Sequence, residues 1–143
     1  MWYFAHPYTV KDKKGNFVPE AETANFDLCN QRAARLVEEG YIIFSPISMS
    51  HSIHRASPTL LSDHAHAFWY FYNSRLLESA SWEGIILAPG WNLSPGCRME
   101  ATWFRQRKLP VREYAKVITD EGKQRHVVKM THQIQIVTPE AQG

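Results

Sequence analysis

The chain has 143 residues, of which 44% are hydrophobic and 21% charged, values typical of one soluble globular domain. Its formal net charge of +2 is too small to indicate a nucleic-acid polymer or an anionic membrane as the main partner. Two cysteines are too few for a disulfide scaffold, and no segment has the apolar length of a membrane span or a secretory signal. We therefore predict a single cytoplasmic domain over residues 1–143.

The first part of the chain predicts a strand, a helix and a second strand. Trp2–Ala5 is a short apolar run of the kind found in buried strands. Over residues 23–39 apolar positions recur at steps of three and four, which predicts an amphipathic helix that Gly40 ends. Residues 41–44 form another apolar run and predict the second strand. This order is that of a right-handed crossover unit.

The later elements continue the alternation of strands and helices. We predict a long loop over 47–61, a helix over 62–80 capped by Ser62, a strand over 84–88, a helix over 95–108 and a strand over 109–114. Residues 116–128 predict a hairpin, and 132–137 another strand or an arm. The expected fold is α/β in three layers, with a Rossmann-like or flavodoxin-like, mostly parallel sheet of four to five strands flanked by helices.

The most informative segment joins the third predicted strand to the following helix. Ser94 is placed as an N-cap, and Gly96 would let a ligand approach the free backbone N–H groups at the positive end of the helix dipole. Arg98 adds positive charge, and Glu100 follows within the first two turns, where the dipole stabilises a carboxylate as the anion. Alternatively, Ser94 is an ordinary cap and Glu100 a surface residue that complements the dipole.

A family resemblance rests on four features in chain order. These are Tyr3-Phe4-Ala5-His6-Pro7-Tyr8, a first helix ended by Gly40, a strand ended by Ser45-Pro46, and Gly90-Trp91 followed by Ser94-x-Gly96-x-x-x-Glu100. Together they resemble the nucleoside 2-deoxyribosyltransferase superfamily, which includes nucleoside 5′-monophosphate N-glycosidases and a small bacterial and phage branch. The likeness spans roughly Tyr3 to Tyr114. It is closest to that branch, through the Gly-Trp pair, and its one specific motif is Ser-x-Gly-x-x-x-Glu.

The resemblance implies roles for the motif residues. Glu100 matches the glutamate that attacks the anomeric carbon of the sugar and forms a covalent glycosyl-enzyme, a suitable task for a carboxylate beside a developing oxocarbenium ion. Ser94 matches the serine that contacts a 5′-phosphate, with the Gly96 and Cys97 amides as helpers. Tyr3 matches the tyrosine that orders the glutamate and the sugar.

The chain also departs from the family pattern at its acidic positions. One family aspartate aligns with Asn73, and a second aligns with Ser81, or with Glu83 if the alignment shifts by two. At least one carboxylate that assists the leaving base is therefore missing, and positioned proton transfer contributes about 10²–10⁴-fold to a rate. Asp63, Glu83 or a histidine is expected to substitute. Otherwise Asn73 is a hydrogen-bonding ligand contact and activity is slow, altered or absent.

Histidines and aromatic residues are the remaining candidates. His6 and His51 follow the first two strands, so we expect them to line the ligand pocket, and Trp91 to stand at its mouth. The spacing of His51 and His54, and of His64 and His66 near Asp63, is weak evidence for a metal, and neither a metal nor a cofactor is predicted. The dense aromatic run over 68–72 covers more than one helix face, which favours a homodimer or a larger homo-oligomer.

The leading hypothesis is a domain that binds a nucleoside or nucleoside 5′-monophosphate and cleaves or transfers at the N-glycosidic bond through a glycosyl-glutamate at Glu100. The alternative is a non-catalytic nucleotide-binding or sensor module of the same fold, favoured by Asn73 and Ser81. A purely structural subunit is supported only by the exposed aromatic run.

Overall fold

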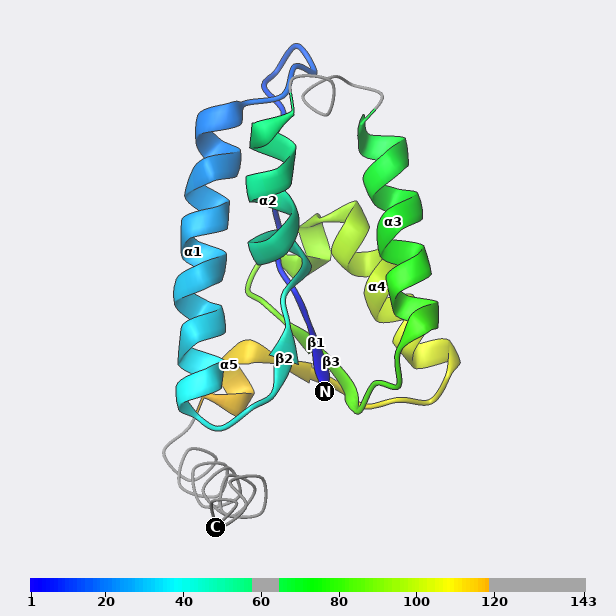
Figure 1. The fold of residues 1–143 in the computed structure, drawn as a ribbon. Coiled ribbons are helices and arrows are strands. Elements are labelled where there is room, and N and C mark those ends of the chain that lie inside the picture. Colours follow the sequence, from blue (N-terminus) through cyan, green and yellow to red (C-terminus); the bar gives the residue numbers. More distant parts are fainter. Residues whose placement is uncertain (58–64, 119–143) are drawn as a thin grey trace, which may run out of the picture.

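A computed structural model describes residues 1–57 and 65–118, and its centre is a parallel sheet (Figure 1). The strands are β1 (Trp2–Ala5), β2 (Ile43–Phe44), β3 (Gly84–Leu87) and β4 (Val111–Glu113). They are parallel throughout and follow the order β2-β1-β3-β4. The predicted α/β architecture is confirmed, with four strands in the described part of the chain.

Helices flank this sheet on both faces. They are α1 (Pro19–Glu38), α2 (Pro46–Ala56), α3 (Ala65–Ser79), α4 (Pro95–Gln106) and the short α5 (Tyr114–Val117), with a 3₁₀ turn η2 (Trp91–Leu93) before α4. Alternate residues of β1 point to opposite faces, as the strand period of two requires. Tyr3 packs in a cluster with α3 and α4, whereas Phe4 packs in a second cluster with α1 and α5. None of the described helices is long and apolar enough to cross a membrane.

The strand order places a topological switch point between β1 and β3. The chain leaves β1 toward β2 on one side, and β3 lies on the other side. Ligands of open α/β sheets bind beyond the carboxyl ends of strands at such a point. Here the loops after β1 and β3 lie side by side, because a Cβ atom built on Gly90 would be 3.6 Å from Cγ of Pro7.

The structure corrects two predictions of secondary structure. Residues 47–61 were predicted as a loop, but α2 covers 46–56, beginning with a proline at its first turn where a missing N–H costs nothing. The first strand of the predicted C-terminal hairpin is also wrong at Lys116 and Val117, which end the helix α5. The proposed cap Ser62, the hairpin from residue 119 onward and the arm lie outside the described residues.

Candidate functional site

Helix α4 carries Glu100 into the interior rather than to the surface. Its residues Cys97, Glu100, Ala101 and Phe104 are all buried, and their spacing places them on one helix face. This face packs against the cluster that contains Tyr3 of β1. Glu100 is only 9% exposed, so the alternative of a surface residue that complements the dipole is wrong.

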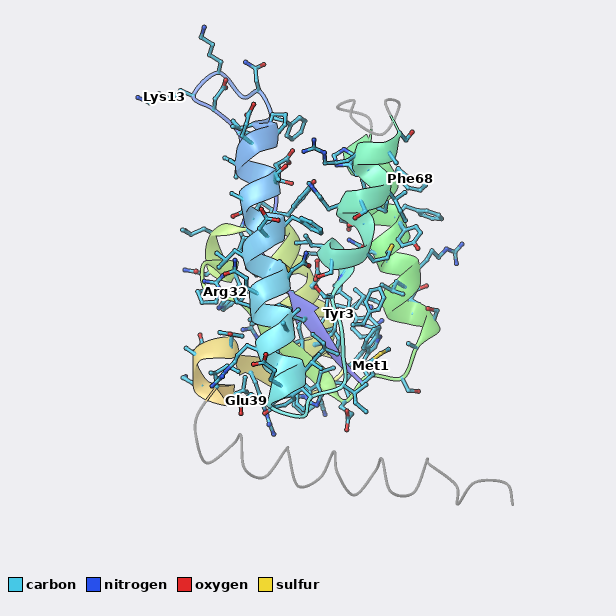
Figure 2. The ribbon with its side chains drawn as sticks, turned by 60° about the vertical axis from the view of Figure 1, so that its left-hand side comes forward. Met1, Tyr3, Lys13, Arg32, Glu39 and Phe68 are labelled. Atoms are coloured by element: carbon cyan, nitrogen blue, oxygen red, sulfur yellow. The ribbon has the colours of Figure 1, made fainter. Side chains whose placement is uncertain are left out.

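Tyr3 and Glu100 form the centre of the candidate site. Tyr3 is fully buried, with its ring edge-on to Trp82 at 5.2 Å between centroids, and Figure 2 shows it in the interior beside the sheet. Its hydroxyl interacts with the Glu100 carboxyl group, an interaction that lowers the pKa of Glu100. Burial, with a smaller contribution from Glu100, raises the pKa of Tyr3. The pair does not reach the geometry of a regular hydrogen bond, and the hydroxyl has no other partner among the described residues.

The charge state of Glu100 differs from the expectation at the helix start. Burial raises its pKa from 4.5 to about 8, and the opposing effect of Tyr3 is smaller. The expectation that the helix dipole keeps this carboxylate ionised is therefore wrong, because burial disfavours the charged form. At neutral pH Glu100 is mostly protonated, and a pKa near the working pH is typical of catalytic carboxyl groups.

The start of α4 is closed by its own cap. The Oγ atom of Ser94 accepts a hydrogen bond from the Cys97 N–H at 3.3 Å, so the expectation that the Cys97 amide is free to help bind an anion is wrong. Gly96 is exposed, and Arg98 is exposed with its guanidinium donating to the Asn92 carbonyl at 2.9 Å. The Ser94 hydroxyl proton, Gly96 and Arg98 remain the groups with which this helix start could meet a phosphate.

On α3 two buried polar atoms lack partners. Among the residues that the structure describes, neither Asn73 Oδ1 nor Trp69 Nε1 has a hydrogen-bond partner. These residues are four apart and therefore share a helix face, and Leu77, four further on, lies in the core cluster with Tyr3. Since buried polar groups are nearly always hydrogen-bonded, an unpaired donor and acceptor on one face indicate a place for a ligand.

The candidate replacements for the missing carboxylate do not join this centre. Glu83 is exposed and pairs with the N-terminal ammonium at 2.9 Å, at the amino end of β3. Ser81 is exposed in the connection before β3. Asp63 lies outside the described residues. Asn73 is thus the only one of the aligned positions in the described part that faces the core, and it cannot ionise.

His6 is held by two hydrogen bonds. Its Nδ1 lies 2.7 Å from the Pro7 carbonyl and must donate to it, which leaves Nε2 to accept from the Arg32 guanidinium at 2.9 Å. Burial lowers its pKa, and Arg32 lowers it further. With both ring nitrogens occupied, His6 fixes the loop after β1 and offers no nitrogen to a ligand.

His51 belongs to a hydrogen-bonded group that connects the loop after β1 to α2. The Tyr8 hydroxyl lies 2.7 Å from Nδ1 of His51 and 3.2 Å from Nδ1 of His54. It can donate to only one of them, so the other imidazole donates to the oxygen. Burial, with a smaller contribution from Glu22, raises the pKa of Tyr8 to about 12, and burial lowers the pKa of His51. Phe26 stacks on His51 at 4.2 Å between ring centroids.

Trp91 is half-buried and packs against the cluster that contains Tyr3. Its ring lies 5.4 Å from the Arg105 guanidinium, and it interacts with the Glu113 carboxylate at the end of β4. Arg105 belongs to α4 and Glu113 to β4, so these two contacts connect η2 to both elements. The position of Trp91 at the mouth of the site stays a prediction.

Trp69, Tyr8 and His54 are not predicted as site residues from the sequence, where they belong only to an aromatic run, the family motif and a weak metal spacing, respectively. The ring centroid of Trp69 lies 6.4 Å from that of His54, so these two residues join α3 to α2. The sequence did contain a signal for helix α2. Ile47, His51 and His54 are separated by four and three residues, the spacing of one helix face, if histidine is treated as a buried residue. Within 1–57 and 65–118, no group of three His, Cys, Asp or Glu side chains could hold a metal ion.

Comparison with known proteins gives a family but no activity. No curated protein matches the sequence. Residues 1–116 match the model of a family described as a domain of unknown function (DUF1937), and the chain therefore belongs to this family.

Proposed function

We propose that the protein binds a nucleoside or nucleoside 5′-monophosphate and cleaves or transfers at the N-glycosidic bond. The observation that carries this proposal is the buried Glu100 carboxyl group facing the Tyr3 hydroxyl beneath the switch point of a parallel sheet. It is supported by the resemblance of Ser94-x-Gly96-x-x-x-Glu100 to the nucleoside 2-deoxyribosyltransferase superfamily.

In the proposed reaction the Glu100 carboxylate attacks the anomeric carbon of the sugar. The carbon–nitrogen bond breaks, and its electron pair leaves with the base, which takes up a proton. Water or a second base then attacks the same carbon and releases the Glu100 carboxylate. Two displacements at one carbon give overall retention of configuration.

The pKa of Glu100 sets which protonation state starts this reaction. Only the ionised carboxylate is a nucleophile, and the pKa of about 8 places its ionisation around pH 8. The Tyr3 interaction favours the anion, which makes Tyr3 a positioning residue for the nucleophile. We therefore propose that kcat/KM, which reports ionisation of the free enzyme, rises with pH through about 8.

A non-catalytic binding module is the second candidate. It is favoured by Asn73, because an amide at the position of a family aspartate cannot donate a proton to the leaving base. It is also favoured by Glu83, which pairs with the N-terminal ammonium and lies outside the core cluster formed with α3 and α4. In such a module the unpaired atoms of Asn73 and Trp69 would still bind a base.

One experiment separates the two candidates. The protein and its Glu100→Gln variant are incubated with a panel of nucleosides and 5′-monophosphates, and released free base is measured by chromatography. Glu100→Gln keeps the shape of the side chain and removes the nucleophile, so catalysis predicts release by the native protein alone. No release, together with ligand-induced stabilisation in a thermal melt, would support the binding module. Equal release by both proteins would overturn the role of Glu100.

A further inference from the structure

We propose that Trp69 and His54 read the outer edge of the base, so that the site takes purines in preference to pyrimidines. This inference rests on the proposed function, because it assigns the base to the α3 face next to Glu100 and Tyr3. The juxtaposition that carries it is a row of polar groups on facing turns of α3 and α2, running from Asn73 through Trp69 to His54.

The row begins at the core and leads outward. Leu77 lies in the cluster that contains Tyr3, Asn73 is four residues earlier in α3, and Trp69 is four earlier again. With a rise of about 1.5 Å per residue, each step along this face is about 6 Å. In Figure 1 α3 runs along the side of the strands and continues past them toward the end where α2 stands. A ligand with its sugar at Glu100 would therefore meet Asn73 first and Trp69 one turn later.

The chemistry of the row matches a neutral heteroaromatic ring. The buried Trp69 Nε1 is a donor and the buried Asn73 Oδ1 is an acceptor, and in the described part of the chain neither has a partner. An acceptor at this position disfavours a phosphate, whereas a base edge presents both acceptors and N–H donors. His54 adds an imidazole whose orientation is fixed by Tyr8, itself held by His51.

The length of the row discriminates between bases. A base that contacts Asn73 must extend by about one helical turn, some 6 Å, to reach Trp69 and His54 as well. A bicyclic purine extends further from the sugar than a single pyrimidine ring. A pyrimidine would leave the Trp69 donor unpaired in the complex, and sites built to hydrogen-bond a group reject analogues that lack it.

The test is a Trp69→Phe variant, which keeps a ring and removes the N–H. Binding of adenine, hypoxanthine, cytosine and uracil as free bases is measured by calorimetry in the native protein and in Glu100→Gln, so that the readout does not depend on catalysis. We expect purines to bind at least tenfold more tightly than pyrimidines, and Trp69→Phe to remove about tenfold of purine affinity while leaving pyrimidine affinity unchanged. His54→Phe should reduce purine affinity in the same selective way.

Matched controls separate this role from a structural one. Trp103→Phe makes the same change on α4, where the ring packs under Arg107 at 3.7 Å, and should leave the purine-to-pyrimidine ratio unchanged. Both variants also lose ring contacts, so a lower melting temperature is expected in each, whereas only Trp69→Phe should change the purine-to-pyrimidine ratio. Equal binding of purines and pyrimidines, or equal losses for both in Trp69→Phe, would overturn the inference. Selective purine binding without base release would leave it standing and reject the catalytic proposal.

Discussion

Replacing Glu100 by glutamine should stabilise the protein, and increasingly so as pH rises from 5 to 8. Burial raises the pKa of the Glu100 carboxyl from 4.5 to about 8, so between these values the folded state keeps a proton that the unfolded chain releases. The unfolded state is favoured by that release, and stability is lost as pH rises. The loss begins near pH 4.5 and is complete above about pH 8.

The magnitude follows from the shift. One pKa unit corresponds to about 1.4 kcal/mol, so a shift from 4.5 to about 8 costs roughly 5 kcal/mol in full. About 3 to 4 kcal/mol of this falls between pH 5 and pH 8. Glutamine has the same shape and does not titrate, so its variant should escape this part of the pH dependence. The difference is a large share of the roughly 5–15 kcal/mol that stabilises a typical domain.

Urea unfolding followed by tryptophan fluorescence at pH 5, 6, 7 and 8 measures this difference. Burial lowers the pKa values of His6 and His51, whose contributions change with pH in the opposite direction, but they are common to both proteins and cancel. Glu83→Gln is the matched control, because Glu83 is exposed and its variant should remain parallel to the native protein. If Glu100→Gln also stays parallel from pH 5 to 8, Glu100 is ionised in the folded state and the reasoning fails.

Three further predictions concern Tyr3, the helix start and the aromatic face of α3. Tyr3→Phe removes a group that lowers the pKa of Glu100, so the rise of kcat/KM should move to higher pH in a pH–rate profile, and an unmoved profile would exclude Tyr3 as a positioning residue. Ser94→Ala should cost about 1 kcal/mol in urea unfolding through the lost cap, and it should weaken 5′-monophosphates more than nucleosides in calorimetry if the hydroxyl meets the phosphate. Phe68 and Phe71 are exposed on α3, and we expect them to lie in a homo-oligomer interface. Light scattering should show a dimer or larger assembly, which the double substitution of both residues by lysine reduces to a monomer. A native protein that is already monomeric would reject this interface.

The two central strands could be predicted from the sequence because they are short apolar runs buried on both faces. Trp2–Ala5 and Gly84–Leu87 are buried at every position, and such runs leave a signal that does not depend on their neighbours. Helix α2 left a weaker signal, the steps of four and three from Ile47 to His51 and His54. Its inner face carries His51 and His54, whose packing against Tyr8 becomes visible only in three dimensions.

The candidate site could be predicted in part. The position of Glu100 near a capped helix start follows from local sequence, because the cap and the proline fix where α4 begins. Its charge state could not be predicted in this way. The helix dipole is a local property that favours the anion. Desolvation of the carboxyl group depends instead on which residues of the core pack around it, Tyr3 among them. The unpaired atoms of Trp69 and Asn73 likewise result from packing and not from spacing.

The energetics of Glu100 support a functional role independently of the family resemblance. A buried carboxyl group with an elevated pKa lowers stability at neutral pH, and glutamine or an apolar residue at this position would avoid that cost. The neighbouring hydroxyl of Tyr3 and the polar atoms of Trp69 and Asn73 on α3 are also buried, and none of them makes a regular hydrogen bond in the described part of the chain. A core selected only for stability would pair such groups or replace them. Groups of complementary chemistry that are left unpaired next to a titratable carboxyl are better explained by a ligand that completes them.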